Sequence, residues 1–379
     1  MTSPRGPQLE FANRGRVPMI YPKKNSPMEI PMVATHKGST LIPTVPVPTV
    51  IPGSYQNQDR VAQGGRTQIP FPTPPVIPHS FRASPSYFKG LSMVDNLINT
   101  EVDNTTWGIA QQQQRAWEDR YQVKKIGPFR YYAVFDGHGG ANKMAPDHVG
   151  DYAVNNLHVR IADKLINRGK APLVNLADVN TVSSLIWQVF VDFDREMYNK
   201  GLKYGTTCTA ILIDDVRNVI YQINLGDSRS IIFNENGIIS STDDHDPEAP
   251  DEYSRIIAAG GNVTGGRVLG QLMLSRAFGD FDLKRYNWVD YDPIHGMVSA
   301  FPDIKVLPKI PCDIILTSDA PFERSAFNND DLVDIARKIM QAVATRPQNP
   351  DLYEIVAVEM VQVIYPRTTD DTTILYAKV

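Results

Sequence analysis

A carboxylate and an imidazole stand close together where a short apolar stretch gives way to glycine. Residues 131–134 are aromatic or apolar, as in a buried β-strand, and Asp136 and His138 follow within the sequence Asp-Gly-His-Gly-Gly. Because glycine lets the backbone approach a ligand closely, this composition is typical of a binding or catalytic site. Asp-Gly is also an ordinary turn sequence, so the stretch alone leaves both interpretations open.

Two further aspartates stand at the ends of predicted strands. Asp319 follows a strand predicted over 313–317, and Asp370 precedes one predicted over 372–378. If these strands lie beside the strand that leads to Asp136, the three carboxylates converge, and they repel one another unless protons or cations neutralise them. Oxygen donors without a set of His or Cys ligands favour Mg²⁺ or Mn²⁺ over Zn²⁺. A single Asp at a strand end is more often a turn residue or a helix cap, so spacing alone does not establish a metal site.

The elements that must position these residues are predicted from apolar periodicity and turn residues. Strands are expected over 107–110, 131–134, 206–213, 218–224, 228–233, 237–240, 313–317 and 372–378, and helices over 141–168, 181–200, 251–259, 329–344 and 350–364. The strands between 206 and 240 are expected to form one antiparallel meander. Because strands and helices are segregated along the chain, an α+β fold with helices packed on antiparallel sheets is favoured over a parallel wound sheet.

The composition of the 379 residues is that of a soluble globular protein. The chain contains no apolar run near the roughly 20 residues that cross a bilayer, and residues 1–10 lack the apolar centre of a secretory signal. Cys208 and Cys312 fit neither a metal site nor a disulfide framework. The sequence therefore predicts a soluble, intracellular protein with neither a membrane nor a nucleic-acid partner.

Proline and charge divide the chain near residue 90. Residues 1–90 hold 16 of the 29 prolines, with 10 basic and 3 acidic residues (+7), whereas 91–379 hold 28 basic and 39 acidic residues (−11). We expect an extended or disordered arm over 1–90 and a folded domain over 91–379. Segments 43–48 and 73–78 are candidate ligands for a proline-binding module, with a plain linker as the alternative. The acidic domain fits either a cation site or an ordinary solvated surface.

From Trp107 to the C-terminus the sequence resembles the metal-dependent Ser/Thr protein phosphatases of type 2C. The resemblance rests on many short motifs that occur in the family's order. They are Glu118-Asp119, VFDGHGG at 134–140, GTTCTA at 205–210, NLGDSR at 224–229, DHDP at 244–247, Arg255 with AGG at 259–261, RVLG at 267–270, LSRAFGD at 274–280, FPD at 301–303, TSD at 317–319 and TDDTT at 369–373.

This resemblance implies two packed antiparallel sheets flanked by helices, an α-β-β-α sandwich, with two Mg²⁺ or Mn²⁺ ions in a cleft at one end. In the family's pattern Asp136 would bridge both ions, Asp319 and Asp370 would bind one, the Gly137 carbonyl would bind the other, and Glu118 with Asp119 would hold metal-bound water. Two cations can lower the pKa of a shared water and neutralise charge on the phosphoryl oxygens.

The implied activity is the hydrolysis of phosphoserine and phosphothreonine in proteins by a metal-activated water. His138 is the candidate acid for the departing oxygen, with a turn histidine as its alternative role. Asp227 matches a position that can contribute to a third, weaker metal site, or it is a simple turn residue. The rival function is a weakly active or inactive scaffold of the same fold, recruited through the arm. A third is the hydrolysis of small phosphorylated molecules.

Three positions depart from the family pattern. Arg115, the candidate phosphate-binding arginine, lies three residues before Glu118 instead of four, and a shift of one residue on a strand reverses the face of a side chain. Ala320-Pro321 follows Asp319 where a glycine is usual, which predicts an altered backbone behind a metal ligand. Asp371 replaces an asparagine and adds another anion.

Overall fold

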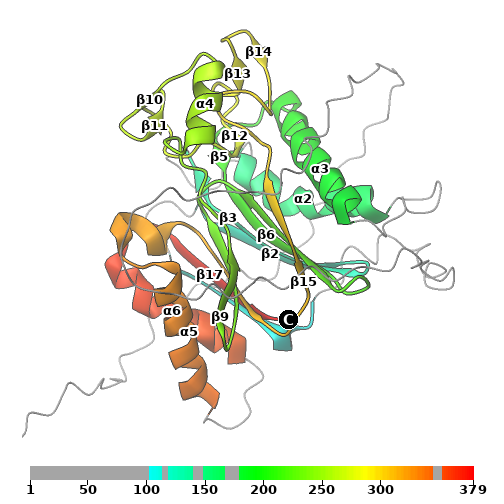
Figure 1. Ribbon diagram of the computed structural model, residues 1–379, viewed down its shortest axis with the longest axis vertical. Helices are drawn as coiled ribbons and strands as arrows, with labels where there is room; N and C mark the ends of the chain where they lie inside the picture. The colour runs from blue at the N-terminus through cyan, green and yellow to red at the C-terminus, as the bar shows by residue number, and fades with distance from the viewer. Residues whose placement is uncertain (1–101, 113–117, 140–147, 167–178, 345–351) are drawn as a thin grey trace, which may run out of the picture. The chain divides into compact units, whose positions relative to one another are not determined.

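The computed structural model describes residues 102–112, 118–139, 148–166, 179–344 and 352–379 (Figure 1). The predicted arm over 1–90 and the candidate Arg115 lie outside these described residues.

Two antiparallel five-stranded sheets are formed by the described residues. The first has the order β15 (Asp303–Pro308), β7 (Val219–Leu225), β6 (Cys208–Asp214), β3 (Phe129–Phe135) and β2 (Arg120–Ile126). The second has the order β1 (Trp107–Gln112), β17 (Thr372–Lys378), β16 (Asp313–Thr317), β8 (Arg229–Asn234) and β9 (Gly237–Ser241). The strands predicted over 313–317 and 372–378 are confirmed with those bounds.

Helices cover the outer face of each sheet, as Figure 1 shows. The helices α2 (Val149–Ile166) and α3 (Val179–Asn199) pack on the first sheet, and α5 (Asn329–Ala344) and α6 (Leu352–Ile364) pack on the second. The layers are therefore helix, sheet, sheet and helix, and the predicted α+β sandwich is confirmed. The helix expected over 141–168 is described only from Val149 to Ile166.

The two-residue period of the strands explains this layering. On β3, Tyr131, Ala133 and Phe135 pack in the core under α2 and α3, whereas Tyr132 and Val134 pack in the core between the sheets. Successive side chains point to opposite faces of a strand, so a strand that is apolar on both faces requires a cover on each side. All five side chains are fully buried.

The predicted meander over 206–240 is wrong in one respect. The strands β6 and β7 pair in the first sheet, but β8 and β9 pair in the second, so the chain crosses between the layers after β7. The crossing includes Gly226, whose φ is +111°, and a Cβ there would lie 2.6 Å from the Thr207 Cγ2. The short link that resembled a hairpin turn is therefore a connection between the sheets, which an alternating sequence pattern cannot distinguish.

Smaller elements gather at one end of the sandwich (Figure 1). A three-stranded sheet has the order β12 (Phe278–Gly279), β5 (Gly205–Thr206) and β4 (Gly137–His138). Beyond it lie α4 (Pro250–Ala258), the β10–β11 pair (Val263–Thr264 with Arg267–Val268) and the β13–β14 pair (Arg285–Tyr286 with Asp290–Tyr291). The 3-10 helices are η1 (Asn104–Thr106), η2 (Ala320–Ser325) and η3 (Tyr365–Arg367).

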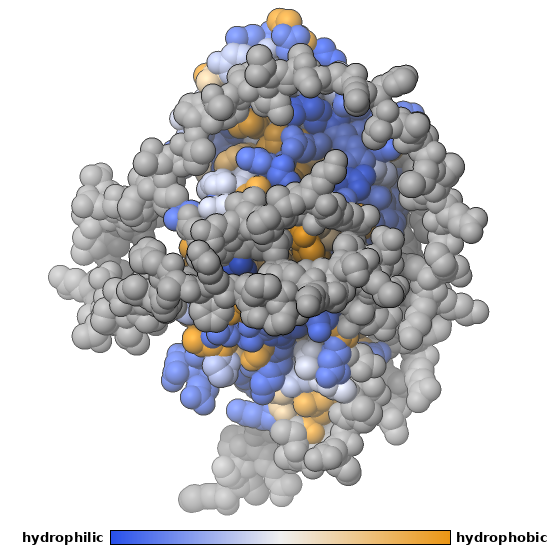
Figure 2. Space-filling model, turned by 90° about the vertical axis from the view of Figure 1, so that its right-hand side faces the viewer, coloured by the Kyte–Doolittle hydropathy of each residue, from blue (hydrophilic) through white to orange (hydrophobic). Residues whose placement is uncertain are grey.

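In the part of the chain that the structure describes, every helix is too short or too polar to cross a bilayer. On the face drawn in Figure 2 the described surface is largely hydrophilic, with separate hydrophobic patches.

Replacement of Ile314 by alanine tests the packing between the sheets. Ile314 is fully buried in the core between them, and Ile310, in the preceding connection, is 38% exposed. We expect Ile314→Ala to lower the free energy of unfolding by about 2–5 kcal/mol, because it leaves a cavity, and Ile310→Ala to change it by less than about 0.5 kcal/mol. Urea denaturation measures both, and equal losses would contradict this layer assignment.

Candidate active site

The backbone of Asp136 is fixed immediately after β3. Its N–H donates to the Thr207 Oγ1 at 3.0 Å, and its carbonyl accepts from the Thr207 N–H at 2.8 Å and from the Thr206 Oγ1 at 3.0 Å. Two threonines that follow one another on the neighbouring segment therefore hold the chain where it leaves the sheet.

The three strand-end aspartates come together across the sandwich, and not along one sheet as the sequence suggested. Asp319 and Asp370 stand at the ends of β16 and β17, which are neighbours in the second sheet, whereas Asp136 comes from β3 in the first. Burial raises the pKa of Asp136 well above its usual range, and the charges of Asp119, Asp319, Asp227 and Asp370 raise it further. The carboxylates are therefore close enough to repel one another.

The other members of this acidic cluster show the same effect. Burial raises the pKa of Asp119 to about 7, against a hydrogen bond from the Thr373 Oγ1 at 2.7 Å. Burial, followed by the charge of Asp244, raises the pKa of Asp227 to about 6. Burial and the charges of Asp227 and Asp370 raise the pKa of Asp319 well above its usual range. Burial is thus the first cause at each of these three carboxylates, and the charge of a neighbouring carboxylate adds to it.

Asp371 connects this cluster to Glu118. The Asp371 carboxylate is buried and accepts a hydrogen bond from the Glu118 N–H at 3.2 Å. Next to it, the Gly137 N–H donates to the Glu118 carbonyl at 3.2 Å. The anion that the sequence placed near the site therefore orients the backbone of the acidic pair. This contact could not be predicted from sequence, because the two residues are 253 positions apart.

The cluster suits a hard cation in its chemistry, although it is not a formed cage of ligands. Across the described ranges, no three His, Cys, Asp or Glu side chains are arranged as a metal site. However, the charges that act most on Asp136 and Asp319 are other carboxylates, and all of them raise the pKa. Buried anions of this kind need a counter-charge, and carboxylate oxygens are the donors that Mg²⁺ and Mn²⁺ prefer. The residues therefore fit these ions.

His138 forms a close pair with Asp280. The His138 Nε2 lies 2.8 Å from the Asp280 Oδ2. Burial lowers the pKa of His138, but the charge of Asp280 and this hydrogen bond outweigh burial and raise the pKa overall. A carboxylate only accepts, so Nε2 is the donor in this contact and Nδ1 is the ring nitrogen that remains for another partner. Sequence analysis did not assign a role to Asp280, which lies 142 positions after His138.

The segment after Asp319 accommodates its unusual residues without strain at Ala320-Pro321. Asp319 has φ −72° and ψ −17°, and η2 begins directly after it. A proline in the first turn of a helix is tolerated, because that turn has no use for its missing N–H. The positive φ angles fall later, at Arg324 (51°) and Ser325 (56°). The change of backbone expected after Asp319 is therefore a short 3-10 helix.

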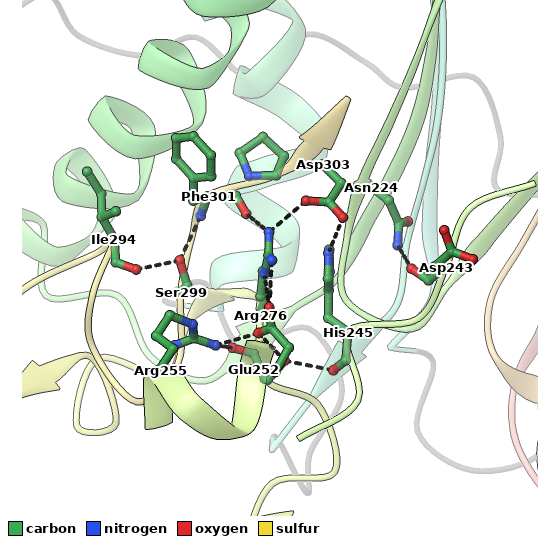
Figure 3. Close-up of polar contacts among 12 residues, drawn as sticks. Asn224, Asp243, His245, Glu252, Arg255, Arg276, Ile294, Ser299, Phe301 and Asp303 are labelled. Carbon is green, nitrogen blue, oxygen red and sulfur yellow. Dashed lines mark hydrogen bonds and ion pairs between the residues drawn. The ribbon is translucent and has the colours of Figure 1, made fainter. Parts of the chain in front are cut away.

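A second polar network is centred on Glu252 and Arg276 (Figure 3). The buried Glu252 accepts from Arg255 at 2.6 Å and from the Arg276 Nε at 2.9 Å. Arg276 also donates to Asp303 at 2.9 Å, and the His245 Nε2 lies 3.4 Å from the same carboxylate.

His245 connects this network to the turn that carries Asp227. Its Nδ1 accepts from the Gly226 N–H at 2.9 Å, directly before Asp227. Several of the matched motifs thus support the site without joining the acidic cluster.

The structure brings most of the predicted site residues together, and one of them lies outside the described residues. Asp119, Asp136, Asp227, Asp319 and Asp370 are brought together, Gly137 and His138 stand directly after Asp136, and Glu118 lies beside Gly137. Arg115 is outside the described residues, so its face is not placed.

Comparison with known proteins agrees with this geometry. The family model described as protein phosphatase 2C matches residues 112–373. The mouse integrin-linked kinase-associated serine/threonine phosphatase 2C is 34% identical over 207 residues, which are 51% of this chain and 47% of that protein. Bovine protein phosphatase 1B is 31% identical over 222 residues, 56% of this chain and 43% of that protein. The chain thus spans about half the length of the curated relatives it matches.

Solved structures share the fold. A phosphatase from a pathogenic strain of Toxoplasma gondii has a TM-score of 0.57 at 21% identity, covering 72% of this chain and 95% of its own. A sex-determining protein of C. elegans has a TM-score of 0.54 at 22% identity, covering 72% of this chain and 64% of its own. Since the matching family model spans residues 112–373, which are more than half of the chain and include the acidic cluster, the chain belongs to the protein phosphatase 2C family.

Proposed function

We propose that this protein hydrolyses phosphoserine and phosphothreonine in other proteins and depends on Mg²⁺ or Mn²⁺. The observation that carries the proposal is the gathering of Asp136, Asp319 and neighbouring carboxylates, with their pKa raised by burial and by one another's charge, at the ends of the two sheets. A cluster of this kind is costly to a protein that does not neutralise it. Membership of the family, and the phosphatases among its relatives, support the same reaction.

The chain offers donors for two cations. Asp136 would contact both, Asp319 and Asp370 would hold one, the Gly137 carbonyl would hold the other, and Glu118 with Asp119 would orient water. Asp227 would contribute to a weaker third site. When bound, the ions would supply an activated water for attack on phosphorus and neutralise the charge of the phosphoryl oxygens.

His138 is proposed as the acid that protonates the departing serine or threonine oxygen. It stands two residues after Asp136, and its Nε2 is held by Asp280 at 2.8 Å. That contact leaves Nδ1 to give its proton to the oxygen as the bond to phosphorus breaks. The ring regains a proton from solvent, because its side chain is 24% exposed.

Loss of single carboxylates tests whether the protein is an enzyme. We expect wild type to hydrolyse a phosphothreonine peptide with Mn²⁺ and not with a chelator. Asp136→Asn and Asp319→Asn should each lower kcat/KM by more than about 100-fold, since even residues outside the first ligand shell give losses of 10–100-fold. Asp334→Asn, at an exposed carboxylate on α5, is the control. A wild type no faster than Asp136→Asn at any Mn²⁺ concentration would identify a scaffold instead.

The acidic cluster should also make the metal-free protein sensitive to pH. A carboxyl whose pKa is raised on folding binds its proton more tightly in the folded state, so its stabilisation is lost as pH rises. For Asp119 the loss runs from its ordinary value near 4 to about 7.

We therefore expect the Tm measured in chelator to fall between pH 5 and 7.5, and to fall less in Asp119→Asn. Each kcal/mol corresponds to roughly 2–4 °C. Differential scanning calorimetry measures both slopes. Equal slopes in wild type and Asp119→Asn would show that folding does not raise the pKa of Asp119, and Asp334→Asn again serves as the control.

A further inference from the structure

Asp194 is a fully buried carboxylate outside the acidic cluster, on α3. Its Oδ1 accepts from the Lys284 Nζ at 2.7 Å and from the Gly279 N–H at 2.9 Å, and its Oδ2 accepts from the Tyr291 hydroxyl at 2.6 Å. The Lys284 Nζ also donates to the Ala277 carbonyl at 2.7 Å. The Asp194 side chain thus joins α3 to Gly279, Lys284 and Tyr291, which lie along the segment from β12 to β14. Figure 1 labels these elements.

Stability alone does not account for this ion pair. The side chains of Asp194 and Lys284 are both 0% exposed. Removing two charges from water costs about as much as their attraction returns, and an apolar pair of similar volume is often as stable or more so. What the ion pair supplies, and an apolar pair cannot, is a fixed set of directions for the groups that it contacts.

The group fixed most tightly is the backbone at Gly279 and Asp280. Both residues have positive φ, at 80° and 50°, which is uncommon for an aspartate. A Cβ at Gly279 would lie 2.1 Å from the Tyr204 carbonyl, and the Asp280 N–H donates to that same carbonyl at 3.0 Å. Tyr204 and Asp194 therefore hold successive N–H groups of this turn.

This turn presents Asp280 to His138. Gly279 ends β12 and His138 ends β4, and both strands pair with β5 between them. From this position the Asp280 Oδ2 reaches the His138 Nε2 at 2.8 Å. A displaced turn would therefore move the Asp280 carboxylate, which orients the imidazole of His138.

We propose that Asp194 is a positioning residue for proton transfer. It holds the Gly279–Asp280 turn so that Asp280 keeps the Nδ1 of His138 directed at the leaving oxygen, and Lys284 and Tyr291 tie the β13–β14 segment to the same anchor. The inference rests on the proposed function, since it needs His138 to be the acid.

The dependence of the rate on the leaving group separates positioning from a general loss of structure. A serine alkoxide is strongly basic and needs a proton as it leaves, whereas p-nitrophenolate is stable without one. A mispositioned His138 therefore slows a phosphoserine peptide far more than p-nitrophenyl phosphate. A damaged fold slows both equally.

The test compares Asp194→Asn with Asp192→Asn, a neighbour on α3 that is 60% exposed, in the full chain with Mn²⁺. We expect Asp194→Asn to lower kcat by roughly tenfold or more for the phosphoserine peptide and by less than about twofold for p-nitrophenyl phosphate, with KM unchanged. His138→Gln should show the same selectivity to a greater extent. Asp192→Asn should match wild type on both substrates.

In Asp194→Asn the buried Lys284 ammonium loses its ion-pair partner, which destabilises the fold. The double variant Asp194→Asn with Lys284→Met removes this ammonium as well, so it separates positioning from misfolding. It should show the same selective loss. The inference would be overturned if Asp194→Asn and the double variant lost activity equally on both substrates, or lost none, while His138→Gln remained selective. A wild type inactive on both substrates would instead overturn the proposed function.

Discussion

The constraint on which the structure depends is the repulsion among carboxylates held between the ends of two packed sheets. Asp136 comes from one sheet, and Asp319 and Asp370 come from adjacent strands of the other. Burial and mutual charge raise the pKa of Asp136 and Asp319 well above the ordinary range. Strand ends are rigid supports, so the chain cannot relieve this repulsion by moving the side chains far apart, and a cation is the simplest remedy.

The surrounding polar contacts supply the rigidity that this arrangement needs. Asp371 holds the Glu118 backbone, Glu252 gathers two arginines under the turn of Asp227, and Asp194 anchors the turn of Asp280. Glu252 is paired with two arginines and Asp194 with Lys284, whereas the charges that act most on Asp136 and Asp319 are those of other carboxylates. The contrast distinguishes anions that build the scaffold from anions available for a ligand.

The strands that carry the site and the fold class could be predicted from sequence, because the residue patterns that indicate them are local. The strands that carry Asp319 and Asp370 follow from short apolar runs, and the α+β class follows from their segregation from the helices. Contacts such as His138–Asp280 and Glu118–Asp371 could not be predicted, because they join residues more than 140 positions apart. The crossing after β7 could not be predicted, because a short link between two alternating strands fits a hairpin and a connection between sheets equally well. At Ala320-Pro321 the departure from the family pattern predicted an altered backbone, and the backbone there forms a 3-10 helix that accommodates the proline in its first turn.

The central claim is that the acidic cluster binds two divalent cations, and anomalous diffraction from crystals grown with Mn²⁺ tests it most directly. We predict two neighbouring manganese peaks between the ends of β3, β16 and β17, with Asp136 contacting both and Asp319 and Asp370 contacting one. An absence of manganese at this end of the sandwich, at Mn²⁺ concentrations that saturate other family members, would contradict the account.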